Sequence, residues 1–354
     1  MRIDQLVPAF HRGDAIGDEA FELRSFFRAS GYESEIYCLD RDRGLESSSR
    51  LFRDFPTPSA RDLTILHFAM ASPLTEALRL MPGKKAVLHH NITPPHFFVT
   101  HDPEIARLTR LGRQELHSLK DVADLALADS EFNRLELEEM GYRRSFVFPL
   151  YIDFAKYEKP VSRFAFDLFR DERVNILFVG RVAPNKRIEH LIKTVFYFKK
   201  FISPLVRLIV VGKTRTFPRY FEACVRMADE FYLNPQEIQF LGHVPDAELA
   251  ALYRASDVFL SLSEHEGFCL PLIESMIFDL PVIALDSTAV PGTLGRAGIL
   301  LRSWRPDKTA ELIRIVARDA DLRNRLVVAG RLELSRFKSF PRQSFLLDRI
   351  REII

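Results

Sequence analysis

The sequence predicts an α/β protein built from two doubly wound parallel sheets. The chain has 354 residues, and about 100 to 200 residues per domain gives two domains that each bury a core. Short apolar runs recur along it, each followed by a longer amphipathic stretch, which is typical of alternating strands and helices. The later runs are rich in Val, Ile and Leu without polar alternation, as expected for strands covered on both faces. Two series of such runs favour two parallel sheets.

The first series occupies residues 34–39, 63–68, 86–90, 125–128 and 146–150. The second begins at Asn175 with NILFVG and continues with RLIVVG, IQFLG, VFLSLS and PVIAL, which start at residues 207, 238, 258 and 281. Between the series lies a stretch of mixed charge with one proline and no clear period, so we expect a linker near residues 155–172. The predicted domains span residues 1–160 and 172–340, and residues 341–354 form an amphipathic helix without a following strand.

Composition and charge exclude several classes of protein. Hydrophobic residues make up 47% and charged residues 28%, which excludes a disordered, fibrous or repetitive chain. The 50 basic and 48 acidic residues leave a net charge of +2, too small for wrapping nucleic acid, so any bound phosphate must be held locally. Cys38, Cys224 and Cys269 lie far apart without CxxC spacing, which indicates neither a disulfide framework nor a zinc site and fits a reducing cytoplasm.

The N-terminal segment predicts neither export nor a membrane span. It carries charges at Arg2 and Asp4 and lacks the long apolar core of a signal peptide. Nowhere do eighteen apolar residues run together, so a spanning helix is not expected. Residues 103–120 mix arginines with apolar residues, which leaves open a contact with a membrane surface beside the simpler interpretation as a surface helix.

The most informative segment runs from Ser261 to Leu285, where an apolar strand ends in acidic residues and a glycine before a helix begins. Glu266 and Glu274 lie eight residues apart, which is about 12 Å along a helix and roughly the length of a nucleotide sugar. Glu266 can accept hydrogen bonds from sugar hydroxyls, Glu274 can bind the diol of a ribose, and the helix N-terminus between them favours a diphosphate. In isolation, such a pair is also typical of a helix cap and a solvated helix residue.

Two cations flank the turn after the strand NILFVG. Arg181 follows Gly180, and Lys186 comes five residues later. An arginine can fork onto two phosphate oxygens, and a lysine adds a compact charge. A solvated loop with unrelated basic residues is the alternative. Gly212 and Gly242 end the next two strands, at the edge where open α/β sheets bind ligands, although either glycine can simply serve a tight turn.

Signals in the first half are weaker. Gly13 and Gly17 lie between the first strand and a helix, where backbone amides can approach a phosphate, but their spacing is not the GxGxxG of dinucleotide sites. Another strand ends in His89 and His90, and strand alternation lets only one of the two imidazoles face a ligand. A structural role is the alternative for that histidine, and equally for His67 at the end of LTILHF.

Common metal and hydrolase motifs are missing from the sequence. Asp40 and Asp42 superficially form a metal-chelating DxD, but they lie early in an arginine-rich stretch, which we interpret as a solvated loop. HExxH, GxSxG and GxxxxGK[ST] do not occur, which argues against a zinc protease, a serine hydrolase and a P-loop enzyme. We therefore predict no metal site and no cofactor.

Taken together, GR-x4-K after one strand and SEHEGFCLPLIESM-x-F-x-LPVIA after another resemble glycosyltransferase family 4, the group 1 transferases with a GT-B fold. The resemblance covers the C-terminal half in order and spacing. It implies two Rossmann-like domains that face a central cleft, the first binding the acceptor and the second the nucleotide-sugar donor, with the C-terminal helix crossing back onto the first. Cys269 and Asp279 stand where the family often has glycine, and Arg296 where an acidic residue is commoner.

The resemblance also implies roles for individual residues. Arg181 and Lys186 would hold the donor diphosphate, Glu266 would contact the transferred sugar, and Glu274 would bind the ribose. His90 would lie near the reacting centre, which completes the expected catalytic set. The expected donor-binding positions further include Gly17, which would face the diphosphate, together with Gly180, Gly212, Gly267, Phe268, Cys269 and Leu270.

The function implied is retaining, metal-independent transfer of a hexose from a nucleotide diphosphate sugar to a hydroxyl acceptor, in cell-surface glycan or glycolipid synthesis. The expected partners are the nucleotide sugar and a saccharide or lipid-linked acceptor, with no nucleic acid. The expected location is the cytoplasm, with peripheral contact to the inner membrane. Two alternatives stay open: a nucleotide-sugar epimerase of the same architecture, which needs acid and base groups, and a non-catalytic assembly partner that binds nucleotide sugar.

Overall fold

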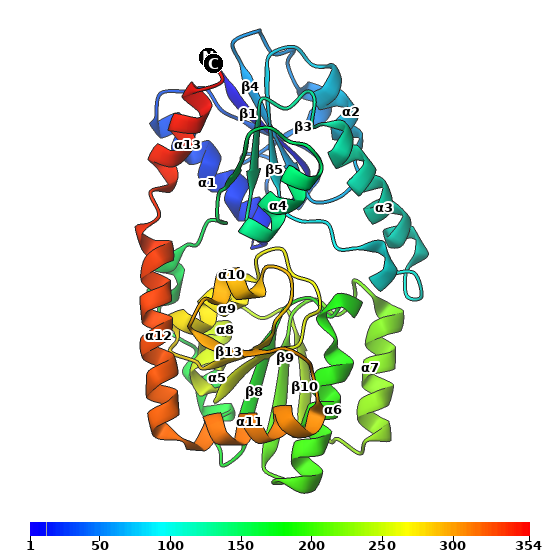
Figure 1. Ribbon diagram of the computed structural model, residues 1–354, viewed down its shortest axis with the longest axis vertical. Coiled ribbons are helices and arrows are strands. Elements are labelled where there is room, and N and C mark those ends of the chain that lie inside the picture. The colour runs from blue at the N-terminus through cyan, green and yellow to red at the C-terminus, as the bar shows by residue number, and fades with distance from the viewer. Residues whose placement is uncertain (12) are drawn as a thin grey trace. The chain divides into compact units, whose positions relative to one another are not determined.

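The computed structural model describes residues 1–11 and 13–354, which divide into two compact units (Figure 1). The first unit comprises Met1–His96, Pro103–Ile152 and Phe340–Ile354, and the second comprises Phe97–Asp102 and Asp153–Ser339. Each unit contains one parallel sheet with helices packed on its two faces. The predicted α/β class with two Rossmann-like sheets is therefore confirmed.

The first unit has a seven-stranded sheet in the order β3-β2-β1-β4-β5-β6-β7. Its strands are β1 (Ile3–Phe10), β2 (Ile36–Arg41), β3 (Arg50–Leu51), β4 (Leu63–Phe68), β5 (Lys84–His89), β6 (Leu125–Ala128) and β7 (Ser145–Val147). Its α-helices are α1 (Ala15–Ala29), α2 (Pro73–Leu80), α3 (Pro103–Ser118), α4 (Glu131–Glu139) and α13 (Arg342–Arg351), and its short 3-10 helices are η1 (Phe52–Asp54) and η2 (Pro95–Phe97), whose last residue falls in the second unit.

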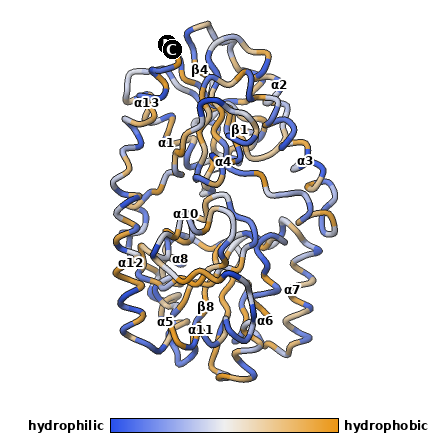
Figure 2. The backbone as a smooth tube through the Cα atoms, viewed as in Figure 1, coloured by the Kyte–Doolittle hydropathy of each residue, from blue (hydrophilic) through white to orange (hydrophobic). Residues whose placement is uncertain are grey.

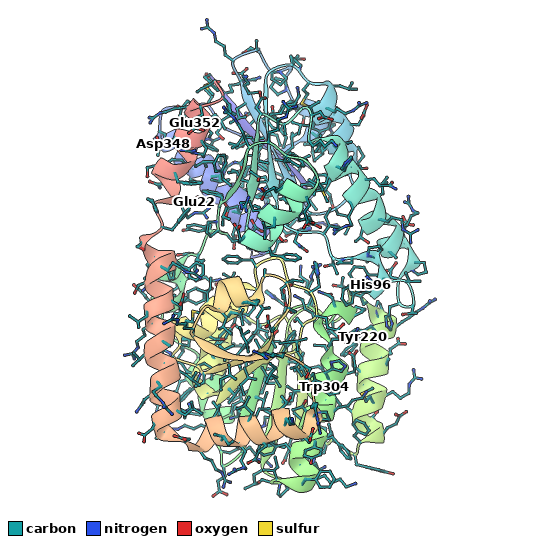
Figure 3. All side chains as sticks on the ribbon, in the orientation of Figure 1. Glu22, His96, Tyr220, Trp304, Asp348 and Glu352 are labelled. Carbon is teal, nitrogen blue, oxygen red and sulfur yellow. The ribbon has the colours of Figure 1, made fainter. Side chains whose placement is uncertain are left out.

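The last helix of the chain belongs to the first unit. Leu346 and Ile350 of α13 join Leu23 and Phe27 of α1 in one buried cluster, whereas α2, α3 and α4 bury their apolar residues in a separate cluster with the sheet. An ion pair of 2.5 Å joins Arg342 to the buried Glu19 of α1. Figure 3 marks these two helices by Glu22 on α1 and by Asp348 and Glu352 at α13. Segments over 300 residues apart in sequence thus share one face of the sheet.

The second unit has a six-stranded sheet in the order β10-β9-β8-β11-β12-β13. Its strands are β8 (Val174–Val179), β9 (Val206–Val211), β10 (Ile238–Gly242), β11 (Val258–Ser261), β12 (Val282–Leu285) and β13 (Gly298–Leu301). Its α-helices are α5 (Arg163–Leu168), α6 (Ile188–Phe201), α7 (Pro218–Glu230), α8 (Asp246–Ala255), α9 (Leu270–Ile277), α10 (Val290–Leu294), α11 (Pro306–Arg318) and α12 (Ala320–Ser339), with 3-10 helices η3 (Phe154–Glu158) and η4 (Pro184–Lys186). Figure 2 shows apolar residues concentrated in the central strands.

The structure differs from the predicted linker near residues 155–172. These residues form η3 and α5 and belong to the second unit, so the division falls between Ile152 and Asp153. Ser162 caps α5 and also donates its amide to the carbonyl of Ala247 in α8 at 2.9 Å. The segment was too short and too charged to show a helical period, although its ends are bonded to the second unit.

Both strand orders contain a point where the winding direction reverses. In the first sheet this switch lies between β1 and β4, and in the second between β8 and β11. Ligands of open α/β sheets bind outside the carboxyl ends of the two strands at such a point. The residues that follow these four strands are therefore the first place to look for a site in each unit.

Candidate active site

In the second unit, Lys186 and Glu266 meet at the switch point. Lys186 ends η4 after β8, and Glu266 lies in the loop between β11 and α9, residues 262–269, which we call the Glu266 loop. Lys186 Nζ lies 2.5 Å from Glu266 Oε2, and the two side chains are only 16% and 8% exposed. Residues eighty positions apart in sequence thus form one largely buried ion pair. A pocket that both residues line, as the sequence analysis expects, needs them to be this close.

Two neighbouring loops hold the backbone around Glu266. Asn185 is buried, its side chain donates to the carbonyl of His265 at 3.0 Å, and its own carbonyl accepts from the Glu264 amide at 2.9 Å. On the other side, Thr288 Oγ1 accepts from the Glu266 amide at 2.8 Å and donates to the Glu266 carbonyl at 2.9 Å. Sequence reasoning assigned no role to Asn185 or Thr288, because both act on backbone atoms that no motif describes.

Arg187 and Glu264 form a second ion pair next to the first in sequence. Arg187 has a left-handed backbone with φ of 51°, and its Nη2 lies 2.5 Å from Glu264 Oε2. The two basic residues 186 and 187 therefore face the two acidic residues 266 and 264. Because Arg187 also contacts Glu189 and the ring of Phe97, its charge is already balanced within the unit. Lys186 and Glu266 have only each other as ionic partners among the described residues.

Arg181 lies at the same edge but is exposed. Among the residues that the structure describes, no side chain or backbone group binds its guanidinium. Gly180 and Gly212 fix the two strand ends beside it, because the Gly212 amide donates to the Gly242 carbonyl and a Cβ at Gly212 would lie 2.1 Å from the Gly180 carbonyl oxygen. The close approach leaves room only for glycine at residue 212.

The turn into α9 has a conformation that favours glycine. Cys269 precedes the helix with φ of 67°, which explains why the related pattern often has glycine here. Leu270 begins α9, Pro271 occupies its first turn, and the carbonyl of Phe268 accepts from Thr293 at 2.6 Å. Burial raises the pKa of the Cys269 thiol well above its usual value, and the nearby Glu266 carboxylate raises it further, so this cysteine stays protonated. Gly267 lies within this same turn.

Glu274 lies on α9, away from Lys186, and its carboxylate is bound by two tyrosines. Tyr157 of η3 donates to Oε1 at 2.6 Å, and Tyr253 of α8 donates to Oε2 at 2.7 Å. Glu274 is 5% exposed. The structure therefore brings Lys186 and Glu266 together directly, and gives Glu274 a separate environment that the sequence interpretation did not include.

One segment from the first half of the sequence belongs to the second unit. Phe98 stacks on Phe217 with ring centroids 5.1 Å apart, and His101 lies edge-on to Tyr220 of α7, a residue labelled in Figure 3. The ring centroids of Phe97 and of His265 in the Glu266 loop lie 6.2 Å apart. Residues 97–102 thus line the second unit near this loop, a contact that no local pattern predicted.

In the first unit, the turn after β1 is closed by acidic side chains. Gly17 cannot carry a side chain, because a Cβ there would lie 1.6 Å from the carbonyl oxygen of His11. Its amide donates to the N-cap residue Asp14 at 2.8 Å, and the Gly13 amide donates to Asp18 at 3.2 Å. Within the turn, two amides that were expected to face a phosphate are thus bonded to carboxylates. Arg12, which precedes Gly13, lies outside the described residues.

His90 belongs to a chain of four side chains that comes from β1, β4 and the segments after β5 and β6. We call Gln5, His67, His90 and Asp129 the histidine chain. Gln5 Oε1 lies 2.8 Å from His67 Nε2, His67 Nδ1 lies 3.0 Å from His90 Nε2, and His90 Nδ1 lies 3.0 Å from Asp129 Oδ2. All four side chains are buried or nearly so.

The geometry of the histidine chain fixes its protons. Gln5 Nε2 donates to the Ala20 carbonyl, so Gln5 Oε1 accepts from His67 Nε2. Neutral His67 then accepts at Nδ1 from His90 Nε2, while His90 Nδ1 donates to the Asp129 carboxylate. His90 is therefore an imidazolium whose two ring nitrogens are both engaged. Burial alone would lower its pKa, but Asp129 outweighs burial and raises it, whereas burial and the His90 charge lower the pKa of His67.

This geometry gives His90 the character of a fixed positive charge rather than a proton acceptor. His89 points elsewhere, to Glu136 of α4 at 2.9 Å, as strand alternation predicts. In sequence, His67 was visible only as a strand-end histidine, and Asp129 and Gln5 carried no signal. Among the described residues, no group of three or more His, Cys, Asp or Glu side chains is arranged to hold a metal ion.

Comparison with known proteins finds that most of the second unit is similar to one family of glycosyltransferases. Residues 162–333 match the family model of "Glycosyl transferases group 1". A "GDP-mannose-dependent alpha-mannosyltransferase" of Mycobacterium tuberculosis is 27% identical over 344 residues, covering 85% of this chain and 84% of that protein. The "O-antigen chain mannosyltransferase B" of Escherichia coli is 41% identical over 124 residues, which are 35% of this chain and 32% of that protein. The match to the E. coli "Serotype-specific mannosyltransferase WbdA" covers only 14% of that protein.

Solved structures share the fold over the whole chain. The HepE protein of Anabaena, in complex with UDP and glucose, has a TM-score of 0.76 at 17% identity and covers 99% of this chain and 100% of its own. WaaG, a glycosyltransferase involved in lipopolysaccharide biosynthesis, has a TM-score of 0.71 at 14% identity and covers 99% of both chains. The protein thus has the GT-B fold.

Proposed function

We propose that this protein transfers a hexose from a nucleotide diphosphate sugar to a hydroxyl acceptor, in the synthesis of a glycan or glycolipid. The match of residues 162–333 to the group 1 glycosyltransferase model and the GT-B fold support this proposal. The observation that carries the proposal is the ion pair between Lys186 and Glu266 at the switch point of the second sheet. All three relatives described above are named as mannosyltransferases, one of them dependent on GDP-mannose, so GDP-mannose is the first donor to test.

The proposed chemistry is one of charge stabilisation. A departing diphosphate develops negative charge, and cations or helix N-termini aimed at it lower the barrier. Exposed Arg181, the half-buried Lys186 and the start of α9 can supply this positive potential from the protein alone, so we propose a metal-independent reaction. When a diphosphate draws Lys186 away, Glu266 is released to accept hydrogen bonds from sugar hydroxyls. We propose retention of the anomeric configuration, as the resemblance implies.

The test is turnover of GDP-mannose and UDP-glucose with saccharide and lipid-linked acceptors, in wild type and in Lys186→Met and Glu266→Gln. We expect both variants to lose about 100-fold or more in kcat/KM. Glu264→Gln is the matched control, because Glu264 lies in the same loop and pairs with Arg187 instead. Full activity in either Lys186→Met or Glu266→Gln would overturn the assignment. Chelator should leave the rate unchanged.

Product analysis separates the alternatives. Incubation with nucleotide sugar and no acceptor yields an epimer if the protein is an epimerase, and free donor or slow hydrolysis if it is a transferase. Calorimetric binding of donor with no product across the acceptor panel would point to the non-catalytic assembly partner. The engaged ring nitrogens of His90 disfavour the epimerase, which needs a free acid or base.

We also propose a peripheral contact with the cytoplasmic face of the membrane as a secondary property. No helix among the described residues is long and apolar enough to cross a bilayer. On α3, Arg107 pairs with Glu104 and Arg113 with Glu136, which leaves Arg110 as the arginine of this helix best able to meet anionic lipid. Flotation with vesicles containing phosphatidylglycerol tests the idea, with Arg110→Gln expected to weaken binding; failure of the wild type to float would remove it.

A further inference from the structure

The carboxylate of Glu274 is held from both sides by phenol groups. Tyr157 donates to Oε1 and Tyr253 to Oε2, so each oxygen takes one hydroxyl. The three side chains come from η3, α8 and α9, and the tyrosines are only 7% and 1% exposed. Because the two hydrogen bonds come from separate elements, they fix the rotation of the buried carboxylate about the last side-chain bond. That torsion is otherwise soft.

Aromatic packing fixes the two phenol groups in turn. The ring of Phe278, just after α9, stacks on Tyr253 with centroids 5.2 Å apart and lies edge-on to Tyr157 at 5.7 Å. Burial raises the pKa of both tyrosines, and the Glu274 carboxylate raises it further, so both remain donors at any physiological pH. The tyrosines are therefore rigid donors, and they present Glu274 in a single orientation.

A carboxylate offers about four lone-pair positions, two on each oxygen. Tyr157 and Tyr253 occupy one on each, and Lys156 Nζ lies 3.9 Å from Oε1. Among the described residues no further hydrogen bond to either oxygen is formed, so each oxygen can accept one more. A pair of adjacent hydroxyl groups, such as a cis diol, has the spacing to donate one hydrogen bond to each oxygen.

We propose that Tyr157 and Tyr253 are positioning residues that orient Glu274 to recognise the cis diol of the donor's ribose. The inference rests on the proposed function, because it takes the bound donor to be a nucleoside diphosphate sugar. It assigns to this chain a discrimination between ribonucleotides and deoxyribonucleotides, set by two phenol groups that never contact the ligand themselves.

The experiment compares GDP with 2′-deoxy-GDP, and UDP with 2′-deoxy-UDP, by calorimetry on the full chain. A site that hydrogen-bonds a hydroxyl with a charged group should prefer the ribonucleotide by about tenfold. We expect Tyr157→Phe and Tyr253→Phe each to reduce that preference severalfold, mainly by weakening ribonucleotide binding, and Glu274→Gln to abolish it. Thermal melting checks that each variant is folded.

Tyr220→Phe is the matched control. The Tyr220 hydroxyl is also buried in the second unit and also donates to a glutamate, Glu189, but it has no contact with Glu274. It should leave the ribose preference unchanged. If both Tyr→Phe variants weaken the two nucleotide forms equally, the tyrosines are merely structural and the inference is wrong.

The remaining outcomes separate this inference from the proposed function. If Glu274→Gln abolishes the preference while Tyr157→Phe and Tyr253→Phe retain it, Glu274 reads the ribose without the tyrosines, which overturns the inference alone. If the wild type binds neither UDP nor GDP, the proposed function itself fails. Should Tyr253→Phe not fold, Tyr157→Phe decides, because Tyr157 comes from the short η3 at the edge of the cluster.

Discussion

Each unit contains a buried polar cluster beside its sheet, and the two clusters come from different kinds of sequence. In the second unit, Lys186 and Glu266 come from two compact loops, and each sits in a stretch of sequence with a readable pattern. In the first unit, Gln5, His67, His90 and Asp129 come one by one from four places along 125 residues. The first arrangement is a pair of opposite charges with no other ionic partner among the described residues. The second is a chain of hydrogen bonds that runs from the Ala20 carbonyl to the Asp129 carboxylate.

This contrast shows that two parallel sheets of the same kind can be accompanied by polar clusters with different chemistry. Each ion of the second unit's pair has a single charged partner, so a diphosphate or a sugar can replace it. The imidazolium of His90 is neutralised on one side by Asp129 and capped on the other by His67. Because both ring nitrogens of His90 are hydrogen-bonded, His90 would act on a nearby ligand through its electric field and would not exchange a proton with that ligand.

The largest effect on stability is expected from opening the ion pair of the second unit. Lys186→Ala leaves the Glu266 carboxylate 8% exposed without its partner, which should cost about 3 kcal/mol of unfolding free energy. The double variant Lys186→Ala with Glu266→Ala should be more stable than the single one, because no unpaired charge remains. Urea denaturation of the four proteins measures the coupling, and additive effects would show that the pair is not a pair in solution.

The next largest effect tests the close backbone approach in each unit. Gly17→Ala and Gly212→Ala would place a Cβ 1.6 Å and 2.1 Å from carbonyl oxygens, so each should lose about 2 kcal/mol or more. Gly13 and Gly242 have left-handed backbones but open space at the Cβ position, so their alanine variants should lose only about 1 kcal/mol. Equal losses for all four in thermal denaturation would contradict the steric explanation.

The sequence predicted the sheets better than it predicted the site environments. Uniformly apolar runs such as 206–211 identify buried parallel strands. The strand β1 is expected only as the strand before Gly13 and is not among the apolar runs, because Asp4, Gln5 and Pro8 interrupt it. Those polar groups are tolerated in a central strand because they are bonded: Asp4 accepts the Glu35 amide at 3.0 Å and Gln5 joins the histidine chain. Such compensation comes from residues remote in sequence, and no local window contains it.

For the candidate site, the resemblance to family 4 assigned Lys186 and Glu266 to one pocket, and the structure pairs the two side chains. Neither the residue pattern nor the resemblance described the surroundings of the Glu274 carboxylate. Its hydrogen-bond partners are Tyr253, to which the sequence analysis gave no role, and Tyr157, which fell in the expected linker. Which atoms a carboxylate binds depends on how three elements pack, and that is tertiary information.

The histidine chain predicts that the stability of the protein depends on pH. His90 has a raised pKa, so its contribution to stability is complete below pH 6.5 and is lost as the pH rises through that raised value. His67 has a lowered pKa, so its contribution is complete above pH 6.5 and is lost on acidification. In wild type the two oppose each other. Asp129→Asn removes the charge that favours His90 protonation and leaves two histidines that prefer to be neutral.

The unfolding free energy of Asp129→Asn should therefore fall by about 1 kcal/mol per pH unit more steeply than that of wild type between pH 6.5 and 5.5. Urea denaturation at several pH values measures the slope. The exposed Asp40→Asn is the control and should follow wild type. A slope for Asp129→Asn no steeper than that of wild type would contradict the assigned protonation of His90.

The smallest effect comes from two neighbouring carboxyls of the first unit with opposite shifts. Burial raises the pKa of Asp4 from 3.8 to about 6, so its charge destabilises the fold progressively as the pH rises from about 4 to 6. Asp62 is also penalised by burial, but the backbone amides of Arg2 and Ser59 outweigh this and lower its pKa to about 2. Its stabilisation is complete above pH 3.8 and is lost as the pH falls through about 2.

Asp4→Asn should therefore raise the melting temperature by a few degrees at pH 7.5 and have little effect at pH 4, since about 1 to 2 kcal/mol moves the melting temperature of a large domain by that amount. Asp62→Asn should lower the melting temperature at both pH values. The two variants can be compared directly, because Arg2 contacts both carboxylates. If Asp4→Asn destabilises at pH 7.5 as Asp62→Asn does, Arg2 rather than burial controls Asp4, and the first unit holds its buried charges by pairing, as the second unit does.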